Sequence, residues 1–422
     1  MKSKQTNRRE FLKLSGLAAI TAAVPFHLNA SPQMPNSNDN NYWTLLREQF
    51  PIDKNIIYLN NGTMGPSPFP VIEKVKKEID NSNFSVHYGG GKHEAMECLA
   101  RFIGAQSGEI ALTHNVTEGI NIVCWGVKLK KGDEVIITSH EHVGNALPWL
   151  YRSTIDKFKL VVIDLAPTAA DTLANIKKAI TKKTKVIAVP HIPCTIGQVL
   201  PVKEICELAK QKGIFSFIDG AHGPGMLDLN LKDMGCDAYA SCCHKWLLGP
   251  NGTGFVYVKK EKLDQVQTKF VGGYSSKEWD LLKKPPFFEG LVEDAHRYHY
   301  GTQSAALYFG IAEAVDFHEK IGKAKIAQRI KFLANYLQAG LMDMGKEKVH
   351  MLTPTESISK AGVISFRPVK GIYNDVVNEC RRSNIILRAV PENNVNCIRV
   401  STHIYNSTDE IDALLKKLKT LL

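Results

Sequence analysis

The sequence predicts an α/β fold, in which helices sandwich a mostly parallel β-sheet and a smaller α+β carboxy-terminal domain follows. Three observations support this prediction. The chain has 422 residues, more than one hydrophobic core usually organises. From about residue 105, short β-branched runs alternate with helical stretches, as in sheets covered by helices. From about residue 304, the alternation gives way to a different pattern.

The sheet is predicted from apolar runs of strand length that are rich in Val and Ile. These runs are residues 134–138, 160–163, 185–189, 214–218 and 254–258. A helix is expected at residues 203–212, between the third and fourth runs. A strand, a helix and another strand in succession favour parallel pairing of the two strands.

The carboxy-terminal pattern begins with a long predicted helix at residues 304–321. Strands are expected at residues 362–366 and 397–400. Near the end of the chain, Ser407 and Glu410 have the spacing of a capping box, and leucines at helical spacing follow them. These elements predict a small domain of mixed helices and strands.

The composition excludes several classes of protein. With 44% hydrophobic and 23% charged residues, the chain is not mainly disordered, collagen-like or a coiled coil. The formal charge is +11, but residues 1–30 hold five Lys or Arg and one Glu, and no dense basic block remains elsewhere. We therefore expect no nucleic-acid partner. Nine cysteines without a CxxC pair are too sparse for a disulfide scaffold.

The amino terminus has the pattern of an export signal. Asn7-Arg8-Arg9-Glu10-Phe11-Leu12-Lys13 fits the twin-arginine motif, and a short apolar run follows it. That run is shorter than a membrane span of about 20 residues. Residues 1–30 are therefore predicted to direct periplasmic export by the twin-arginine machinery, and they are either cleaved or kept as an anchor. The alternative is a mobile basic tail with a chance Arg-Arg pair.

The expected organisation has four parts. After the signal, a segment rich in Asn, Ser and Pro reads as a linker, and the remainder divides where the alternation of strands and helices stops. The predicted parts are the signal at residues 1–30, the linker at 31–44, a large α/β domain at 45–310 and a small α+β domain at 311–422.

Ionisable side chains follow several of the predicted strands. In open α/β sheets, binding sites form at the carboxyl ends of the strands. Four strand ends therefore mark a candidate site, and their residues are His140, Glu141 and His142, then His191 and Cys194, then Asp219 and His222, then His244 and Lys245.

Asp219 and Lys245 carry the most informative chemistry. Asp219 follows an apolar run, where a partly desolvated carboxylate favours a cationic partner. Lys245 lies in a weakly polar stretch, and burial makes a lysine amine a usable nucleophile. With a stacking histidine, the pair suits pyridoxal phosphate, which forms a Schiff base with a lysine and keeps its ring nitrogen protonated beside a carboxylate. A plain salt bridge would also explain the pair.

Candidates for phosphate and metal binding give weaker signals. Asn115-Val-Thr-Glu-Gly119 lies just before a predicted helix at residues 120–127, so its backbone N–H groups and the Thr117 hydroxyl could hold a phosphate. His140 and His142 could grip a metal, but no clear third ligand is present, so no metal is expected. A P-loop and a GxSxG motif are both absent.

Three motifs follow one another along the chain: Asp219-Gly-Ala-His222, Cys243-His244-Lys245 and Gly249-Pro-Asn-Gly252. Together they resemble the cofactor region of the class V, fold-type I aminotransferases. The opening Tyr58-Leu-Asn-Asn-Gly-Thr-Met-Gly-Pro66 is similar to that of isopenicillin-N epimerase and its relatives. The similarity runs from about residue 45 to the end of the chain. It implies the fold-type I transferase fold and pyridoxal 5'-phosphate as cofactor.

The resemblance implies roles around the ring of the cofactor. Lys245 would form the Schiff base, and Asp219 would pair with the pyridinium nitrogen. His222 would reach the ring hydroxyl, and His142 would stack on the ring.

The resemblance also implies roles around the phosphate and the substrate. Thr117 and His244 would bind the phosphate. Gly301 and Thr302 resemble a loop that contributes phosphate contacts from a partner subunit, which implies a homodimer. Arg399 would grip the substrate carboxylate, a task that suits a bidentate guanidinium.

The cysteines depart from the pattern of the cysteine desulfurases in this group. Those enzymes carry a nucleophilic cysteine on a loop before the substrate arginine, whereas residues 388–396 contain none. Cys397 lies two residues before Arg399 in a predicted strand, so we expect it to be buried. Cys194 and Cys242 lie near the presumed ring and are lesser candidates, with packing as the alternative.

These observations predict an enzyme that acts at the α-carbon of an amino acid or a peptide-like amine through Lys245. An epimerase-like or aminotransferase-like reaction is favoured by the opening motif. The alternatives are a cysteine C–S lyase or desulfurase, a binding protein that keeps the fold without turnover, and a metal protein that uses His140 and His142.

Overall fold

The computed structural model describes residues 34–35, 41–86 and 89–422. The chain divides into two units, residues 1–33 and 34–422, and every described residue belongs to the second. The predicted export motif therefore lies outside the described residues. Among the helices of the described part, none is long and apolar enough to cross a membrane.

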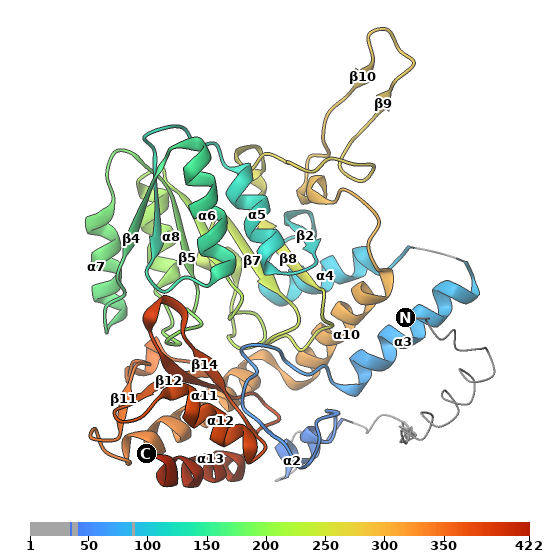
Figure 1. Ribbon diagram of the computed structural model, residues 1–422. Coiled ribbons are helices and arrows are strands. Elements are labelled where there is room, and N and C mark those ends of the chain that lie inside the picture. The colour runs from blue at the N-terminus through green and yellow to red at the C-terminus, as the bar shows by residue number, and fades with distance from the viewer. Residues whose placement is uncertain (1–33, 36–40, 87–88) are drawn as a thin grey trace, which may run out of the picture. The chain divides into compact units, whose positions relative to one another are not determined.

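A seven-stranded sheet forms the centre of the second unit (Figure 1). Its order is β2-β8-β7-β6-β5-β3-β4, with parallel pairing from β7 to β4 and antiparallel pairing of β8 with β7 and β2. The strands are β2 (Ile110–Thr113), β3 (Glu134–Thr138), β4 (Lys159–Ile163), β5 (Thr184–Pro190), β6 (Phe215–Asp219), β7 (Ala238–Cys242) and β8 (Gly254–Val258). The predicted, mostly parallel sheet is confirmed, and each strand run predicted for it lies within one residue of an observed strand.

Helices cover both faces of this sheet because its strands are apolar on both sides. Side chains alternate along a strand, so Ile136 joins one hydrophobic core while Val135 and Ile137 join the other. The first core includes side chains of α4 (Lys92–Ile103), α7 (Ala169–Ala179), α8 (Val202–Gln211), α9 (Leu231–Met234) and α10 (Ala305–Ile321). The second includes side chains of α5 (Val116–Gly126) and α6 (Val143–Asp156).

The carboxy-terminal part forms a second, antiparallel sheet (Figure 1). Its order is β11-β12-β15-β14, with β11 (Val349–Met351), β12 (Val363–Pro368), β14 (Arg388–Val390) and β15 (Cys397–Ser401). One hydrophobic core joins this sheet to α11 (Lys323–Met342), α12 (Tyr373–Arg382) and α13 (Thr408–Leu421). The predicted mixture of strands and helices is confirmed.

The predicted capping box begins the last helix. The Ser407 hydroxyl accepts a hydrogen bond of 3.2 Å from the Glu410 backbone N–H, and the Glu410 carboxylate accepts one of 3.2 Å from the Ser407 backbone N–H. The domain boundary at residue 310 falls inside α10 and stays a prediction.

The segment before α4 runs back to the carboxy-terminal sheet. Its elements are α2 (Tyr42–Arg47), β1 (Ile57–Tyr58) and α3 (Phe69–Phe84), which packs along α10. The short β1 pairs in parallel with β13 (Ile385–Ile386), and Asn60 forms a parallel bridge with Ser401 at the end of β15. The backbone N–H of Gly65 donates to the carbonyl of His244, 2.8 Å away. Residues 60–65 therefore lie between the two sheets.

Two features differ from the sequence prediction. The helix expected at residues 120–127 begins earlier, at Val116, because the Asn115 side chain caps it by accepting a hydrogen bond of 3.0 Å from the Glu118 N–H. A hairpin of β9 (Trp279–Asp280) and β10 (Phe287–Phe288), which the sequence analysis did not predict, projects away from the central sheet (Figure 1).

Candidate active site

The strand ends singled out from the sequence meet at one edge of the seven-stranded sheet. The parallel strands β7, β6, β5 and β3 are neighbours in that order, so their carboxyl ends point the same way. Lys245, Asp219, Cys194 and His142 follow these four strands. Lys245 lies close enough for its charge to act on the pKa of each of the other three, beside the larger effect of burial.

Lys245 contacts His222 directly. The Lys245 Nζ lies 3.4 Å from the His222 Nε2, while the His222 Nδ1 accepts a hydrogen bond of 3.0 Å from the Trp246 indole. Because an indole nitrogen only donates, the neutral His222 ring carries its proton on Nε2. That N–H group points at the lysine amine, so the His222 ring fixes the position of the amine. Burial holds the pKa of His222 well below its usual range, so the ring stays neutral.

Asp219 ends β6 in a buried position, with 4% of its surface exposed. Its carboxylate accepts a hydrogen bond of 3.0 Å from the Ala221 backbone N–H. Burial raises the pKa of Asp219, and the Ala221 hydrogen bond and the Lys245 charge oppose that effect. A carboxylate desolvated in this way is stabilised by a cationic or protonated partner in the site.

His142 and Thr117 come together at the beginnings of two helices. His142 is the N-cap of α6, and its Nδ1 accepts a hydrogen bond of 3.0 Å from the Gly144 N–H. Thr117 lies in the first turn of α5. A Cβ added to Gly144 would lie 2.8 Å from the Thr117 hydroxyl oxygen and 3.1 Å from the His142 Nδ1. Glycine at position 144 therefore keeps this small polar space open.

His244 and Arg399 each leave a buried nitrogen without a partner. The His244 Nδ1 and the Arg399 Nε make no hydrogen bond in the described part of the chain. Buried polar atoms are normally satisfied, so both nitrogens favour a bound polar group.

Arg399 is fully buried in the middle of β15. Its guanidinium donates to the Asn60 side-chain oxygen at 3.1 Å, to the Thr63 hydroxyl at 2.7 Å and to the Cys194 carbonyl at 3.4 Å. All three partners are neutral. Burial, with the nearby charge of Arg388 as the next cause, lowers the pKa of Arg399 to about 10, so it remains a cation at neutral pH.

Gly62 keeps a gap between Arg399 and His222. A Cβ at this position would lie 3.2 Å from the His222 ring and 3.3 Å from the Arg399 guanidinium carbon. The Gly62 N–H donates to the Ser401 hydroxyl at 2.9 Å, which holds the segment in place. The lysine–histidine pair and the buried arginine thus face a common space.

Gly301 and Thr302 do not join this group within one chain. Thr302 is exposed, and it lines a separate pocket with Gly89, Lys92 and Tyr274. Their predicted contact with a phosphate depends on a second subunit and stays a prediction.

The nine cysteines are all buried and unpaired. Cys397 is 0% exposed, and its thiol points at the Thr195 carbonyl, 3.6 Å away. Burial raises the pKa of Cys397 to about 12. Cys194 and Cys242 are buried as well, and burial raises the pKa of each thiol. Within the described residues, no three His, Cys, Asp or Glu side chains are grouped as metal ligands.

The sequence analysis missed several residues that shape the site. Asn60 and Thr63 hold Arg399, and the motif at residues 58–66 was their only signal. Trp246 fixes the His222 tautomer, and it directly follows Lys245. Arg388 acts on the pKa of His142, although burial has the larger effect. It lies in β14, which was not predicted.

This sheet with its flanking helices and strand-end site is the fold-type I arrangement of pyridoxal-phosphate-dependent enzymes, as in solved cysteine desulfurases. The chain belongs to the aminotransferase class V family, whose model matches residues 57–414. The family uses pyridoxal phosphate. The family and the fold that the sequence resemblance implied are therefore confirmed.

Curated relatives in two groups are similar over most of the chain. A probable cysteine desulfurase from Pyrococcus abyssi is 28% identical over 397 residues, which cover 89% of this chain and 97% of the relative. The isopenicillin N epimerase of Streptomyces clavuligerus is 27% identical over 410 residues, which cover 90% and 98%.

Solved structures of similar proteins include sulfur-metabolising enzymes. The complex of the cystine C–S lyase C-DES with its product cysteine persulfide superposes with a TM-score of 0.80 at 26% identity, covering 88% of this chain and 99% of that one. The apo cysteine desulfurase from Thermococcus onnurineus gives 0.78 at 26% identity, covering 89% and 96%.

The residues of this chain fit pyridoxal phosphate. An amine on Lys245, a buried carboxylate on Asp219 and a neutral ring on His142 suit the aldehyde, the ring nitrogen and the ring face. The open space kept by Gly144 beside Thr117, and the unpartnered Nδ1 of His244, suit a phosphate group.

His142 gives a prediction about stability and pH. Burial, and then the charge of Lys245, lowers the pKa of His142 to about 4 from an ordinary value near 6.5. Between these values the unfolded chain binds more protons, so unfolding becomes easier as the pH falls from 6.5 towards 4. We expect His142→Gln to lose less unfolding free energy than the wild type between pH 7 and pH 5 in urea denaturation. The control is His350→Gln, at an exposed histidine, and an equal acid loss in His142→Gln and wild type would contradict the prediction.

Proposed function

We propose that this class V enzyme acts at the α-carbon of an amino acid or a peptide-like amine, in an epimerase-like or aminotransferase-like reaction. One observation carries the proposal. The Lys245 amine, oriented by the His222 Nε2–H, faces the same space as the buried Arg399 guanidinium across the gap at Gly62. A lysine and an arginine so placed suit a substrate with a reactive α-carbon beside a carboxylate.

The protein residues divide the work of this reaction. When bound, the cofactor supplies an electron sink that stabilises negative charge at the α-carbon. Arg399 binds the α-carboxylate with two N–H groups and fixes which bond at the α-carbon lies in reach. With cofactor and substrate bound, the Lys245 Nζ would take the α-proton as general base and could return it. Asp219 would hold the cofactor at its ring nitrogen and keep that nitrogen protonated, and His142 would cover the ring face.

A cysteine C–S lyase or desulfurase is the second candidate, and the names of the relatives favour it. Such a reaction begins with the same removal of the α-proton, so Lys245 and Arg399 keep their roles. The buried Cys397 and the absence of cysteine from residues 388–396 disfavour a persulfide carried by the protein. Under this candidate, sulfur would leave as a small molecule.

The test of the proposed reaction compares Lys245→Ala with wild type. We expect purified wild type to contain pyridoxal phosphate and to exchange the α-proton of an amino acid in D2O, measured by NMR over an amino-acid panel. Lys245→Ala should exchange roughly 10²–10⁴-fold more slowly, because it lacks the general base.

The matched control is Lys260→Ala, at an exposed lysine, which should exchange like wild type. Keto-acid and sulfide assays run in parallel separate transamination and C–S cleavage from epimerisation. A protein that purifies without cofactor, or a Lys245→Ala variant that exchanges at the wild-type rate, would refute the proposal.

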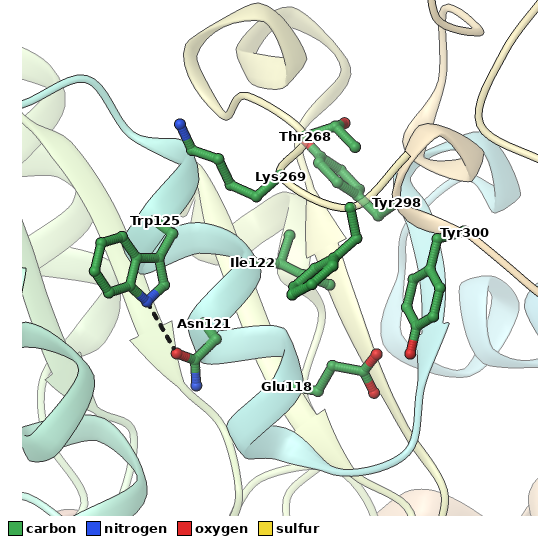
Figure 2. A pocket seen from close by; sticks show the side chains of 9 residues that line it. Glu118, Asn121, Ile122, Trp125, Thr268, Lys269, Tyr298 and Tyr300 are labelled. Carbon is green, nitrogen blue, oxygen red and sulfur yellow. Dashed lines mark hydrogen bonds between the residues drawn. The ribbon is translucent and has the colours of Figure 1, made fainter. Parts of the chain in front are cut away.

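We further propose that the enzyme is a homodimer, because an apolar face of the described chain lacks a cover. A cavity of about 370 Å³ lies between α5 and the segment at residues 268–300. Figure 2 shows the side chains that line it. Trp125 lines this cavity and contacts Tyr151 of α6, with ring centroids 6.0 Å apart. Tyr151 shares an exposed face of α6 with Val143, Leu147 and Leu150.

A second copy is the occupant that suits this face. Tyr300 lines the cavity and directly precedes Gly301 and Thr302, the residues expected to reach the phosphate of a partner subunit. A dimer that covers the face would therefore place this loop at the interface.

The dimer gives a prediction about mass in solution. Analytical ultracentrifugation should find twice the chain mass of 46.9 kDa. Leu147→Glu with Tyr151→Glu should shift the protein to monomers, since charges buried at an interface are costly. Val162→Glu, at an exposed valine of β4, is the matched control and should stay dimeric. A monomeric wild type would overturn the proposal.

Export through the twin-arginine machinery is the last part of the proposal, and it rests on Arg8 and Arg9. In cell fractionation, we expect wild type in the periplasm, free or anchored. The double variant Arg8→Lys and Arg9→Lys should accumulate in the cytoplasm, while Lys2→Arg with Lys4→Arg should not change the location. A wild-type protein found wholly in the cytoplasm would show the prediction to be wrong.

A further inference from the structure

Two arginines lie directly opposite each other in the carboxy-terminal sheet. Arg388 of β14 pairs with Arg399 of β15 in the antiparallel register. Residues paired in this way lie on the same face, with Cβ atoms about 4.5–5.5 Å apart, and like charges there repel. The pair therefore needs negative charge close by.

One carboxylate serves both cations. Glu392 forms an ion pair with Arg388, and its charge also acts on Arg399. In the part of the chain that the structure describes, Glu392 is the only carboxylate that forms an ion pair with either arginine. Among the described residues, the hydrogen-bond partners of the Arg399 guanidinium are the neutral groups of Asn60, Thr63 and Cys194. The arginine pair thus keeps an excess positive charge.

Arg388 lies on the same face of the sheet as Arg399, because the two residues are paired across β14 and β15. Its charge acts on the pKa of His142, of His222 and of Cys194, beside the larger effect of burial. The turn after β14 is fixed over the same edge, because the Asn393 side chain donates to the Glu141 carbonyl at 3.2 Å. Arg388 is only half-buried, so a ligand can reach it.

We infer that Arg388 is a specificity-determining residue and that the substrates are amino acids with a second acidic group. This inference rests on the proposed function, in which Arg399 binds the α-carboxylate. Arg388 binds the distal carboxylate, and the planar guanidinium suits a bidentate contact. The two negative charges of the substrate then balance the two arginines. The distal carboxylate binds Arg388 either beside Glu392 or in place of it.

The alternative is a structural role, in which the ion pair of Arg388 and Glu392 only fixes the turn between β14 and β15. The two roles differ in what a substitution changes. A structural pair affects folding and treats all ligands alike, whereas a binding arginine discriminates between dianions and monoanions of the same shape.

The experiment measures binding of unreactive acids to the holoenzyme by isothermal titration calorimetry. Succinate, glutarate and adipate are compared with their monoamides, which have the same length and one charge less. At least one dianion should bind tenfold or more tightly than its monoamide. In Arg388→Gln this preference should fall to within about twofold. Arg388→Lys should keep part of the preference, because lysine keeps the positive charge but lacks the planar guanidinium that makes a bidentate contact.

Arg381→Gln removes an exposed arginine of α12 and is the matched control, which should keep the preference. Melting temperatures of all variants report on folding. Equal binding of dianions and monoamides by wild type would overturn the inference, and so would a full preference in a folded Arg388→Gln. If Arg388→Gln does not fold, Arg388→Lys decides the test. The inference would be overturned if Arg388→Lys had the melting temperature of wild type and also its full preference for dianions.

These acids have no amine, so their binding does not depend on turnover. A second arm compares α-proton exchange of 2-aminoadipate and norleucine in D2O. Exchange of both at equal rates, lost in Lys245→Ala, would support the proposed function and refute this inference. A cofactor-free protein that still prefers dianions would refute the proposed function, while the dianion preference expected from Arg388 would remain.

Discussion

The buried guanidinium of Arg399 is the interaction on which the site depends. From its place in β15, the guanidinium joins parts of the chain that are far apart in sequence, since its hydrogen-bond partners are Asn60, Thr63 and Cys194. Taking a cation out of water costs several kcal/mol, and neutral partners return only part of that. The amino-terminal segment, the central sheet and the carboxy-terminal sheet are thus held together around a buried cation whose hydrogen-bond partners are neutral.

The electrostatics of the strand-end edge follow from burial. Burial lowers the pKa of His142, His222 and His244, so these rings are neutral at neutral pH and serve as acceptors, donors and stacking surfaces. The positive charge of the site is left to Arg388, Arg399 and Lys245. In a space of low dielectric, such localised charge attracts and orients carboxylates strongly.

The sequence predicted most of the central sheet, because strands buried on both faces are nearly continuous apolar runs that begin and end abruptly. It also predicted that ionisable side chains at four strand ends lie along one edge of the sheet, since parallel neighbours share an edge. It could not predict that Asn60 and Thr63 hold Arg399, or that Arg388 lies beside it. These contacts depend on the register of β14 against β15 and on the return of residues 57–65 to the carboxy-terminal sheet, and pairing register across long loops leaves no local pattern. The early start of α5 was missed because Asn115, as a cap, moved the helix boundary by four residues.

The position of Cys397 narrows the chemistry open to this fold. Cys397 and Arg399 are two residues apart on one strand, so they point to the same face, and the thiol packs against the Thr195 carbonyl next to the carbonyl that holds Arg399. Moving this thiol out to a ligand would require breaking the strand that positions Arg399. A sulfur carrier needs an accessible thiolate, and burial raises the pKa of this thiol to about 12. Under the proposed function, any cleavage of a carbon–sulfur bond would therefore depend on Lys245 and on the fate of the α-carbanion, the same step that epimerisation and transamination share.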